Sequence, residues 1–434
     1  MSPEIVGFVG IIVMLILFAI GMPISFAMAL AGVAGYAYIV SPTVGFSLLP
    51  RDIFEQFASY PLSVIPMFVL MGSYAFASGI GKKLFETANT LVGRMPGGLA
   101  IATIAASAGF GAICGSTTAT CATMGKIAIP EMKRFGYKDW MSTGTVAVSG
   151  GLGIMIPPST TFIVYGLLTE QSIGKLFIAG IIPGIILAVL LMATVFYIAK
   201  RDPSGSSIGQ ATTLNQKLTS LKGLTDTIIL FVVTIGGLFG GWFTPTQAGA
   251  IGAAGALVIG LINRELTWLK FIGATKEGLR LSSMIMLLIA GATVFGHFIT
   301  RTGMPVALAD WVGSLNVSPT IIMLLIIAFW FVMGCFIDAM ALIVLLVPIL
   351  LPVITKLGYD LIWFAVIVTV LSMIAVVTPP VGVNAYVVKG ITDDVPLTTI
   401  FKGIVPFLIP LIVGTVILIA FPELSIFLTR IITY

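Results

Sequence analysis

The sequence predicts an all-α protein that crosses a membrane many times and consists of two inverted structural repeats. Of its 434 residues, 58% are hydrophobic and only 9% are charged, whereas soluble domains carry about 25% charged residues. Prolines and glycines recur at an offset of 222 residues, and short polar motifs interrupt two long apolar segments. In membrane transporters with such repeats, broken helices at the repeat interface hold the substrate site.

One offset relates the helix breakers of the two halves. A separation of 222 residues joins Pro157-Pro158 with Pro379-Pro380, Gly136-Tyr137 with Gly358-Tyr359, Pro130 with Pro352, and Pro23 with Pro245. We therefore predict a first repeat over 1–200, a linker over 201–225 and a second repeat over 226–434.

Apolar runs bounded by charged residues, glycine or proline predict about ten membrane-spanning segments. They cover 5–20, 24–40, 61–79, 142–169, 174–199, 226–240, 246–262, 282–300, 360–391 and 398–422. The segments 142–169 and 360–391 contain the Pro-Pro pairs and are expected to be broken halfway. Two further segments, 97–130 and 319–355, predict re-entrant hairpins whose tips end inside the membrane.

The charges of the loops predict the orientation. Basic residues flank the first hairpin on both sides and fill the linker, which makes that side cytoplasmic by the positive-inside rule. Few cations flank the second hairpin, so it is expected to open to the periplasm, with both termini on the periplasmic side. Segment 264–281 places Trp268 and Phe271 among cations and predicts an amphipathic helix at the cytoplasmic interface.

The composition also argues against several function classes. The net charge of +5 arises mostly in short loops, where it sets topology, and so does not indicate nucleic-acid binding. Cys114, Cys121 and Cys335 lie in apolar segments and are expected to be small interior residues. The chain has one histidine, no nucleotide-binding loop and no catalytic triad, so we expect no enzyme.

Polar residues at membrane depth mark the candidate site. The tip of the first hairpin reads GSTTAT over residues 115–120, and its hydroxyl and carbonyl oxygens suit a small cation. Exposed helix N-termini at such a tip can also receive an anion. At the offset of 222, Ser116 corresponds to Asp338 in the second tip, where a carboxylate is costly unless paired or ion-bound. The alternatives are close helix packing for the first tip and a structural hydrogen bond to tip amides for Asp338.

The Pro-Pro pairs predict unwound turns, because proline leaves the carbonyl four residues earlier without its helical donor. Ser159, Thr160, Thr161 and Asn384 add side-chain oxygens, and we expect each turn to meet the hairpin tip of its own half. The predicted sodium ligands are Gly115, Ser116, Thr120, Pro157, Asp338, Thr378, Pro379 and Gly382. The predicted substrate contacts are Arg301, Ser116, Thr117, Thr118, Asp338, Pro158, Ser159 and Asn384.

Arg301 follows an apolar run and allows two interpretations. Its planar guanidinium suits a substrate carboxylate, but a long basic side chain near a helix end also reaches water at the membrane surface. His297 lies one helical turn earlier. For His297 we favour a satisfied polar residue within the helix bundle.

In this order, the motifs resemble the large membrane subunit of the tripartite ATP-independent periplasmic (TRAP) transporters. The matching segments are GSTTAT, IPEMKRFGY, IPPST, GWFTPTQAGAIGA, GCFIDAMALIVLLVPILLP and TPPVGVNAYV. Gln247 stands in the fourth of these where the family commonly has an acidic residue.

The resemblance implies a permease subunit of the bacterial inner membrane that works by an elevator mechanism. Such transporters import organic-acid anions, of the sialic acid or dicarboxylate type, by sodium symport. A periplasmic binding protein delivers the anion, and a small four-helix membrane subunit is the second partner. Sodium is the coupling ion, and no other cofactor is expected. The alternatives are a stand-alone divalent-anion/sodium symporter without a binding protein, and a channel or membrane-embedded enzyme.

Overall fold

The computed structural model describes residues 2–202 and 212–432, and this part of the chain is 82% helical with no strand. The helices of the first half are α1 (Pro3–Ala19), α2 (Ile24–Ile39), α3 (Pro42–Phe57), η1 (Pro61–Ser63), α4 (Val64–Ala77), α5 (Ile80–Val92), α6 (Gly98–Cys114), α7 (Thr117–Arg134), α8 (Asp139–Ser149), α9 (Leu152–Met155), α10 (Thr160–Thr169) and α11 (Ile173–Arg201).

The second half contains α12 (Leu214–Ser220), η3 (Leu221–Leu224), α13 (Thr225–Phe231), the π-helical turn η4 (Val232–Gly236), α14 (Gly237–Phe239), α15 (Pro245–Ile262), α16 (Trp268–Arg301), α17 (Met304–Ser314), α18 (Pro319–Gly334), α19 (Ala339–Lys356), α20 (Leu361–Ala375), α21 (Val383–Lys389), α22 (Leu397–Ala420) and α23 (Glu423–Ile431).

The helix bounds follow the offset that relates the helix breakers. Helix α7 begins at Thr117 and α19 at Ala339, and both begin directly after a polar residue that caps the helix. Between α7 and α8 the chain turns at Gly136 with φ +76°, and between α19 and α20 it turns at Gly358 with φ +78°. Equivalent glycines therefore end equivalent helices in the two halves, since only glycine adopts this backbone readily.

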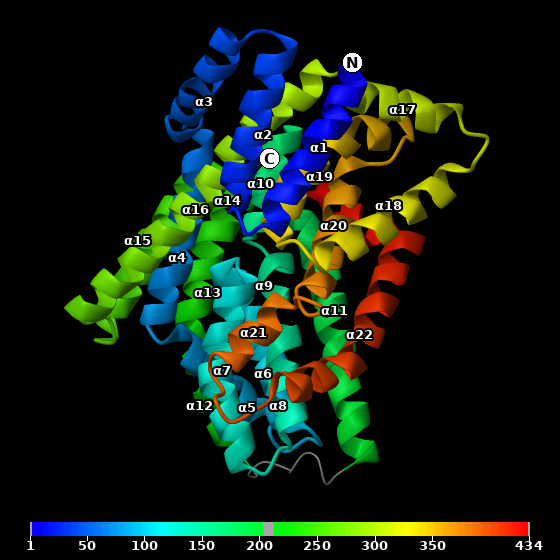
Figure 1. Ribbon diagram of the computed structural model, residues 1–434. Helices are drawn as coiled ribbons and strands as arrows, with labels where there is room; N and C mark the ends of the chain where they lie inside the picture. The colour runs from blue at the N-terminus through cyan, green and yellow to red at the C-terminus, as the bar shows by residue number, and fades with distance from the viewer. Residues whose placement is uncertain (1, 203–211, 433–434) are drawn as a thin grey trace.

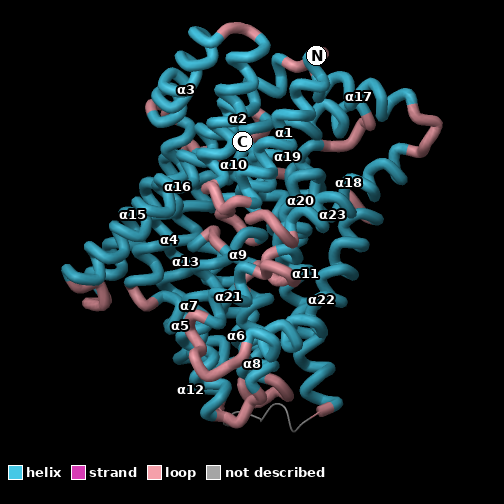
Figure 2. Tube along the Cα trace, in the orientation of Figure 1, coloured by secondary structure: helices cyan, strands magenta, loops and turns pink. Residues whose placement is uncertain are grey.

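The helices form two groups that meet in the middle of the molecule (Figure 1). In one group α2 packs against α16, and α15 against α4. In the other, α6 and α7 pack with α8, and α22 packs with both α8 and α11. Figure 2 shows loop segments deep inside the fold beside α9, α11 and α20, where the broken helices change direction.

By length and composition, seven helices of the described residues can cross a membrane, or eight if the bent pair Pro42–Phe57 and Pro61–Ala77 forms one span. The expectation of about ten spans is too high by this measure. Helices α1, α2 and α20 have only 17, 16 and 15 residues, whereas a full span needs about 20. One of the seven, α19, is an arm of the second hairpin.

The expected division between an interfacial helix over 264–281 and a span over 282–300 is wrong. Both lie in the continuous helix α16, which has 34 residues. Its sequence contains no proline, and Gly273 and Gly278 are tolerated within the helix, so no residue forces a break. Helices α3, α5 and α17 were not expected, because their sequences mix polar and apolar residues.

The contact between α8 and α22 depends on two glycines. A Cβ atom on Gly403 of α22 would overlap the backbone oxygen of Trp140, and one on Gly144 of α8 would overlap the backbone of Gly403. Small residues of this kind let membrane helices approach closely and gain van der Waals contact. The contact joins the two halves of the chain, because α8 belongs to the first and α22 to the second.

Gly403→Ala should therefore destabilise the protein by about 1–3 kcal/mol, the usual cost of overpacking a close contact. Thermal unfolding of the purified protein in detergent measures the effect. Gly273→Ala is the matched control, since a Cβ there meets no described atom within 4 Å. An equal loss of stability in both variants would contradict the assignment.

Candidate substrate and ion site

Both hairpins end in a helix N-terminus that is capped by a polar side chain. In the first, Gly115 has φ +65° and ends α6, and the Ser116 hydroxyl accepts a hydrogen bond from the amide of Ala119 at 3.4 Å. In the second, a carboxylate oxygen of Asp338 accepts from the amide of Met340 at 3.0 Å. The two predicted tip residues therefore hold equivalent places, each satisfying an amide that the helix leaves without a partner.

Each broken helix meets the hairpin tip of its own half. The amide and the hydroxyl of Thr160 both donate to the carbonyl oxygen of Gly115, at 3.3 and 2.7 Å. In the second half the amide of Val381 donates to the carbonyl oxygen of Cys335 at 3.3 Å. These bonds close each tip onto an unwound turn and place two helix N-termini side by side.

The carbonyls that the prolines leave without helical donors are bonded within the protein. Pro158 cannot donate to Ile154, and the Ser159 hydroxyl donates to that oxygen instead. Pro380 cannot donate to Val376, whose oxygen accepts from the amide of Asn384 at 3.0 Å. The Ile154 and Val376 oxygens are thus occupied, so the unwound turns offer fewer carbonyl ligands than the sequence suggests.

Asn384 connects the second half to the first. Its side-chain amide donates to the carbonyl oxygen of Ala147 at 2.9 Å, and its own carbonyl oxygen accepts from the Cys121 thiol at 3.7 Å. The side chain is fully buried, and its Oδ1 atom has no partner among the described residues. The same holds for the hydroxyls of Thr120 and Thr161. Buried oxygens without partners are costly and call for water or an ion.

The remaining predicted residues have mixed surroundings. Thr117 is buried, and the hydroxyls of Ser116 and Thr118 lie 3.2 Å apart. The hydroxyl of Thr378 donates to the carbonyl oxygen of Ile374 at 2.7 Å, as a helical threonine commonly does. Gly382 has φ +58° and begins α21, where a side chain would be strained.

The two tip regions differ in exposure. In the first half the turn residues Pro157, Pro158 and Ser159 are buried. In the second half Asp338 and Pro379 are exposed, and so is the neighbouring Pro380. One tip is therefore closed by the surrounding protein and the other is open.

Arg301 is not joined to either tip. It is the last residue of α16 and is exposed, and no hydrogen bond or ion pair links it to a tip residue in the described structure. Its position in the last helical turn is favourable for a cation. Its role as a clamp for a substrate carboxylate stays a prediction.

His297 has a partner that the sequence analysis missed. Its Nδ1 atom lies 2.8 Å from a carboxylate oxygen of Asp52, which is buried on α3. The other Asp52 oxygen has no partner among the described residues. A helical reading of 42–57 would have found Asp52, because Gly45, Leu48 and Asp52 lie on one buried face of α3.

Comparison with known proteins decides the family. The family described as "Tripartite ATP-independent periplasmic transporter, DctM component" matches residues 11–424. The chain belongs to this family. As a member it is a multi-pass membrane component of a transporter and not an enzyme.

Several curated relatives of this TRAP permease are similar along most of its length. It is 36% identical over 380 residues to the C4-dicarboxylate TRAP transporter large permease protein DctM of Pseudomonas aeruginosa, covering 87% of this chain and 88% of the relative. It is 33% identical over 429 residues to the sialic acid TRAP transporter large permease protein SiaM of Vibrio cholerae, covering 99% and 98%.

A longer relative is the isethionate TRAP transporter permease protein DctMQ of Oleidesulfovibrio alaskensis, which is 35% identical over 375 residues. The alignment covers 86% of this chain but only 59% of the relative. The YdaH transporter of Alcanivorax borkumensis has a similar fold, with a TM-score of 0.63 at 16% identity over 87% of this chain and 89% of YdaH. At this identity the likeness concerns the fold alone.

His297→Ala should lower the stability of the TRAP permease by about 1.5–3 kcal/mol, because the buried Asp52 carboxylate would lose its hydrogen-bond partner. Thermal unfolding in detergent measures the loss. The double variant Asp52→Leu with His297→Ala should be less destabilised than the sum of the single variants, because it leaves no buried charge. Additive losses would show that the two residues act independently.

Proposed function

We propose that this TRAP permease imports an organic-acid anion by sodium symport. A periplasmic binding protein delivers the anion, and a small four-helix membrane subunit completes the transporter in the bacterial inner membrane. The observation that carries the proposal is the pairing of helix N-termini, α7 with α10 in one half and α19 with α21 in the other. Each pair is held together by hydrogen bonds between a hairpin tip and an unwound turn.

The paired N-termini favour an anion. Each helix N-terminus carries a partial positive charge and unsatisfied amides, and two that converge add their effects. The hydroxyls of Ser116, Thr117 and Thr118 supply further donors at the first tip, which has no acidic residue. The relatives named above are called permeases for C4-dicarboxylate, sialic acid and isethionate, which share an acidic group. We therefore assign an organic-acid anion to this chain without choosing among them.

Sodium coupling is supported by oxygens that lack partners. Thr120 and Asn384 each bury a side-chain oxygen without a hydrogen bond in the described structure, and Asp338 places an exposed carboxylate at the second tip. Neutral oxygens with at most one carboxylate suit a monovalent cation. Within the described residues no group of three His, Cys, Asp or Glu side chains could hold a metal ion. A bound sodium ion would also offset the repulsion between Asp338 and an anionic substrate.

Inverted repeats and an elevator mechanism complete the proposal. The recurrence of helix bounds at the 222-residue offset supports two repeats, and the basic loops around the first hairpin support opposite orientations. Both ends of the chain lie in the upper half of Figure 1, opposite to α12, as expected if the termini share the periplasmic side. The hairpins and broken helices form the moving group, and α2, α3, α4, α15 and α16 form the fixed one.

Uptake into proteoliposomes tests the coupling. With the binding protein and the small subunit present, accumulation of a radiolabelled carboxylate should require an inward sodium gradient. Replacing sodium by potassium at the same ionic strength is the control. Uptake that proceeds without sodium would refute symport, and sodium-driven uptake without the binding protein would support the stand-alone symporter.

Asp338→Asn separates the charge of this residue from its role as a helix cap. Asparagine caps a helix N-terminus about as well as aspartate, so the thermal stability should change by less than about 0.5 kcal/mol. Sodium-driven uptake should nevertheless fall by at least about tenfold, because a carboxylate at membrane depth is retained for ion binding. The matched control is Asp360→Asn, which alters the cap of α20 outside the tips. Normal uptake by Asp338→Asn would leave the residue a structural cap.

A further inference from the structure

Two glycines occupy equivalent places beside the two hairpins. Helix α4 and helix α16 are each followed by a glycine in the left-handed conformation, Gly79 with φ +75° and Gly303 with φ +70°, and each glycine begins the next helix. Counting back seven residues from these turns reaches Gly72 in α4 and Gly296 in α16. The end of α16 is therefore the counterpart of α4.

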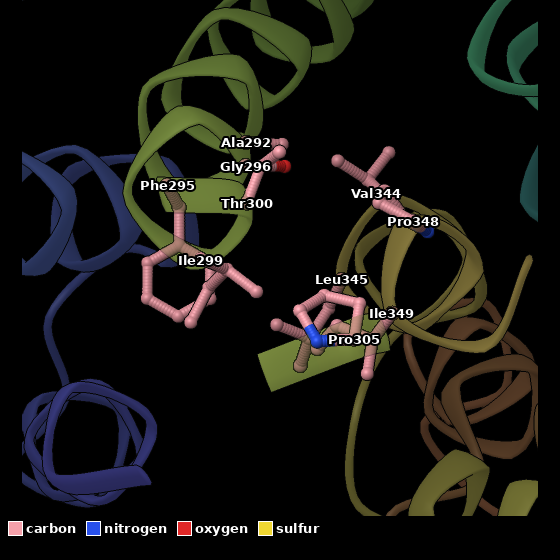
Figure 3. Close-up of a pocket in the computed structure, with 10 residues that line it drawn as sticks. All are labelled: Ala292, Phe295, Gly296, Ile299, Thr300, Pro305, Val344, Leu345, Pro348 and Ile349. Atoms are coloured by element: carbon pink, nitrogen blue, oxygen red, sulfur yellow. The ribbon is translucent and has the colours of Figure 1, made fainter. Parts of the chain in front are cut away.

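Gly72 and Gly296 have opposite surroundings. A Cβ atom on Gly72 would lie 2.9 Å from the backbone oxygen and 3.0 Å from the Cα atom of Cys114, so α4 touches the tip of the first hairpin. A Cβ atom on Gly296 would meet no described atom within 4 Å. Figure 3 shows Gly296 facing a crevice, with Val344 and Pro348 of α19 on the other side.

The same asymmetry runs along the first arm of each hairpin. Helix α18 rests on α20, and one apolar face of it is exposed, formed by Ile321, Leu324, Leu325, Phe329, Val332 and Phe336. At the offset of 222 residues, the corresponding residues of α6 and its tip are all buried, namely Leu99, Ala102, Thr103, Ser107, Phe110 and Cys114. The second half thus leaves open a face that the first half covers.

Helix α1 shows the complementary difference. Its exposed apolar face consists of Ile5, Phe8, Ile12, Val13 and Ile16. The residues 222 positions later, Thr227, Leu230, Thr234, Ile235 and Leu238, are all buried. They belong to the segment α13–α14, and α13 packs against α6. The contact between α6 and α13 therefore has an unmade counterpart between α18 and α1.

We infer that the tip of the second hairpin, at Phe336, docks into the crevice at Gly296 in a second conformation, in which the two halves exchange surroundings. The open face of α18 is then covered by α1, as α6 is covered by α13 here. This contact rests on the proposed inverted repeats. Gly296 leaves the room that a close approach to a hairpin tip requires, as Gly72 does for Cys114.

The exchange has a simple energetic basis. Two halves with equivalent helices offer equivalent surfaces, so a contact made by one half and released by the other changes the total buried area little. Such an exchange gives two conformations of similar free energy, which alternating access needs. The occupant of the open α18 face is therefore a segment of the same chain.

Cysteine cross-linking tests the contact in the full-length protein in native membranes. Gly296→Cys and Phe336→Cys are combined in a background with Cys114, Cys121 and Cys335 changed to alanine. Mild oxidation should produce at least about tenfold more disulfide than in the control, because a disulfide requires Cα atoms within about 7 Å. The control pairs Gly296→Cys with Leu325→Cys, because Leu325 is 63% and Phe336 62% exposed on one face. Leu325 lies eleven residues, or about 16 Å, from the tip.

Mass spectrometry of proteolytic peptides identifies the linked pair, and maleimide labelling shows that both cysteines are accessible. Labelled cysteines that cross-link no better than the control would overturn the inference and leave the α18 face to lipid. As a second measurement, spin labels at Ile16 and Phe336 should report a short-distance population besides the one described here, and a single long distance would also count against it. Cross-linking without sodium-driven uptake would refute the proposed transport and keep the contact, whereas the reverse result would refute the contact alone.

Discussion

The fold depends on the need to satisfy every backbone group where a helix breaks at membrane depth. Lipid offers no hydrogen bonds, so each hairpin tip and each unwound turn must find its partners within the protein. The first tip does so through Gly115, whose carbonyl oxygen accepts two bonds from Thr160. The second does so through Cys335 and Val381. These bonds place four helix N-termini in two pairs, and the chemistry of the site follows from that placement.

The two halves share their elements but not their environment. Ser116 and Asp338 cap equivalent helices, yet the first tip is neutral and enclosed while the second is acidic and open. A neutral tip with converging amides suits an anion, and an exposed carboxylate suits a cation. The difference in charge is written in the sequence, whereas the difference in exposure belongs to this conformation.

Local signals account for what sequence reasoning predicted well. Proline and glycine act on their own backbone, so both hairpins and both broken helices could be predicted close to their observed bounds. Helices α3, α5 and α17 escaped because their polar residues resemble those of loops. The pair of Asp52 and His297 spans 245 positions of the chain, and no local pattern indicates that the two meet.

The sequence by itself determined that this chain is a membrane transporter of the TRAP family, where its helices break and which tip carries a charge. These properties follow from composition and from residues that dictate their own conformation. The tertiary structure alone decided that α16 is continuous, that Ser159 and Asn384 satisfy the carbonyls left by proline, and that the second tip is the open one. Such features depend on which distant segments pack together, and packing is a property of the whole chain.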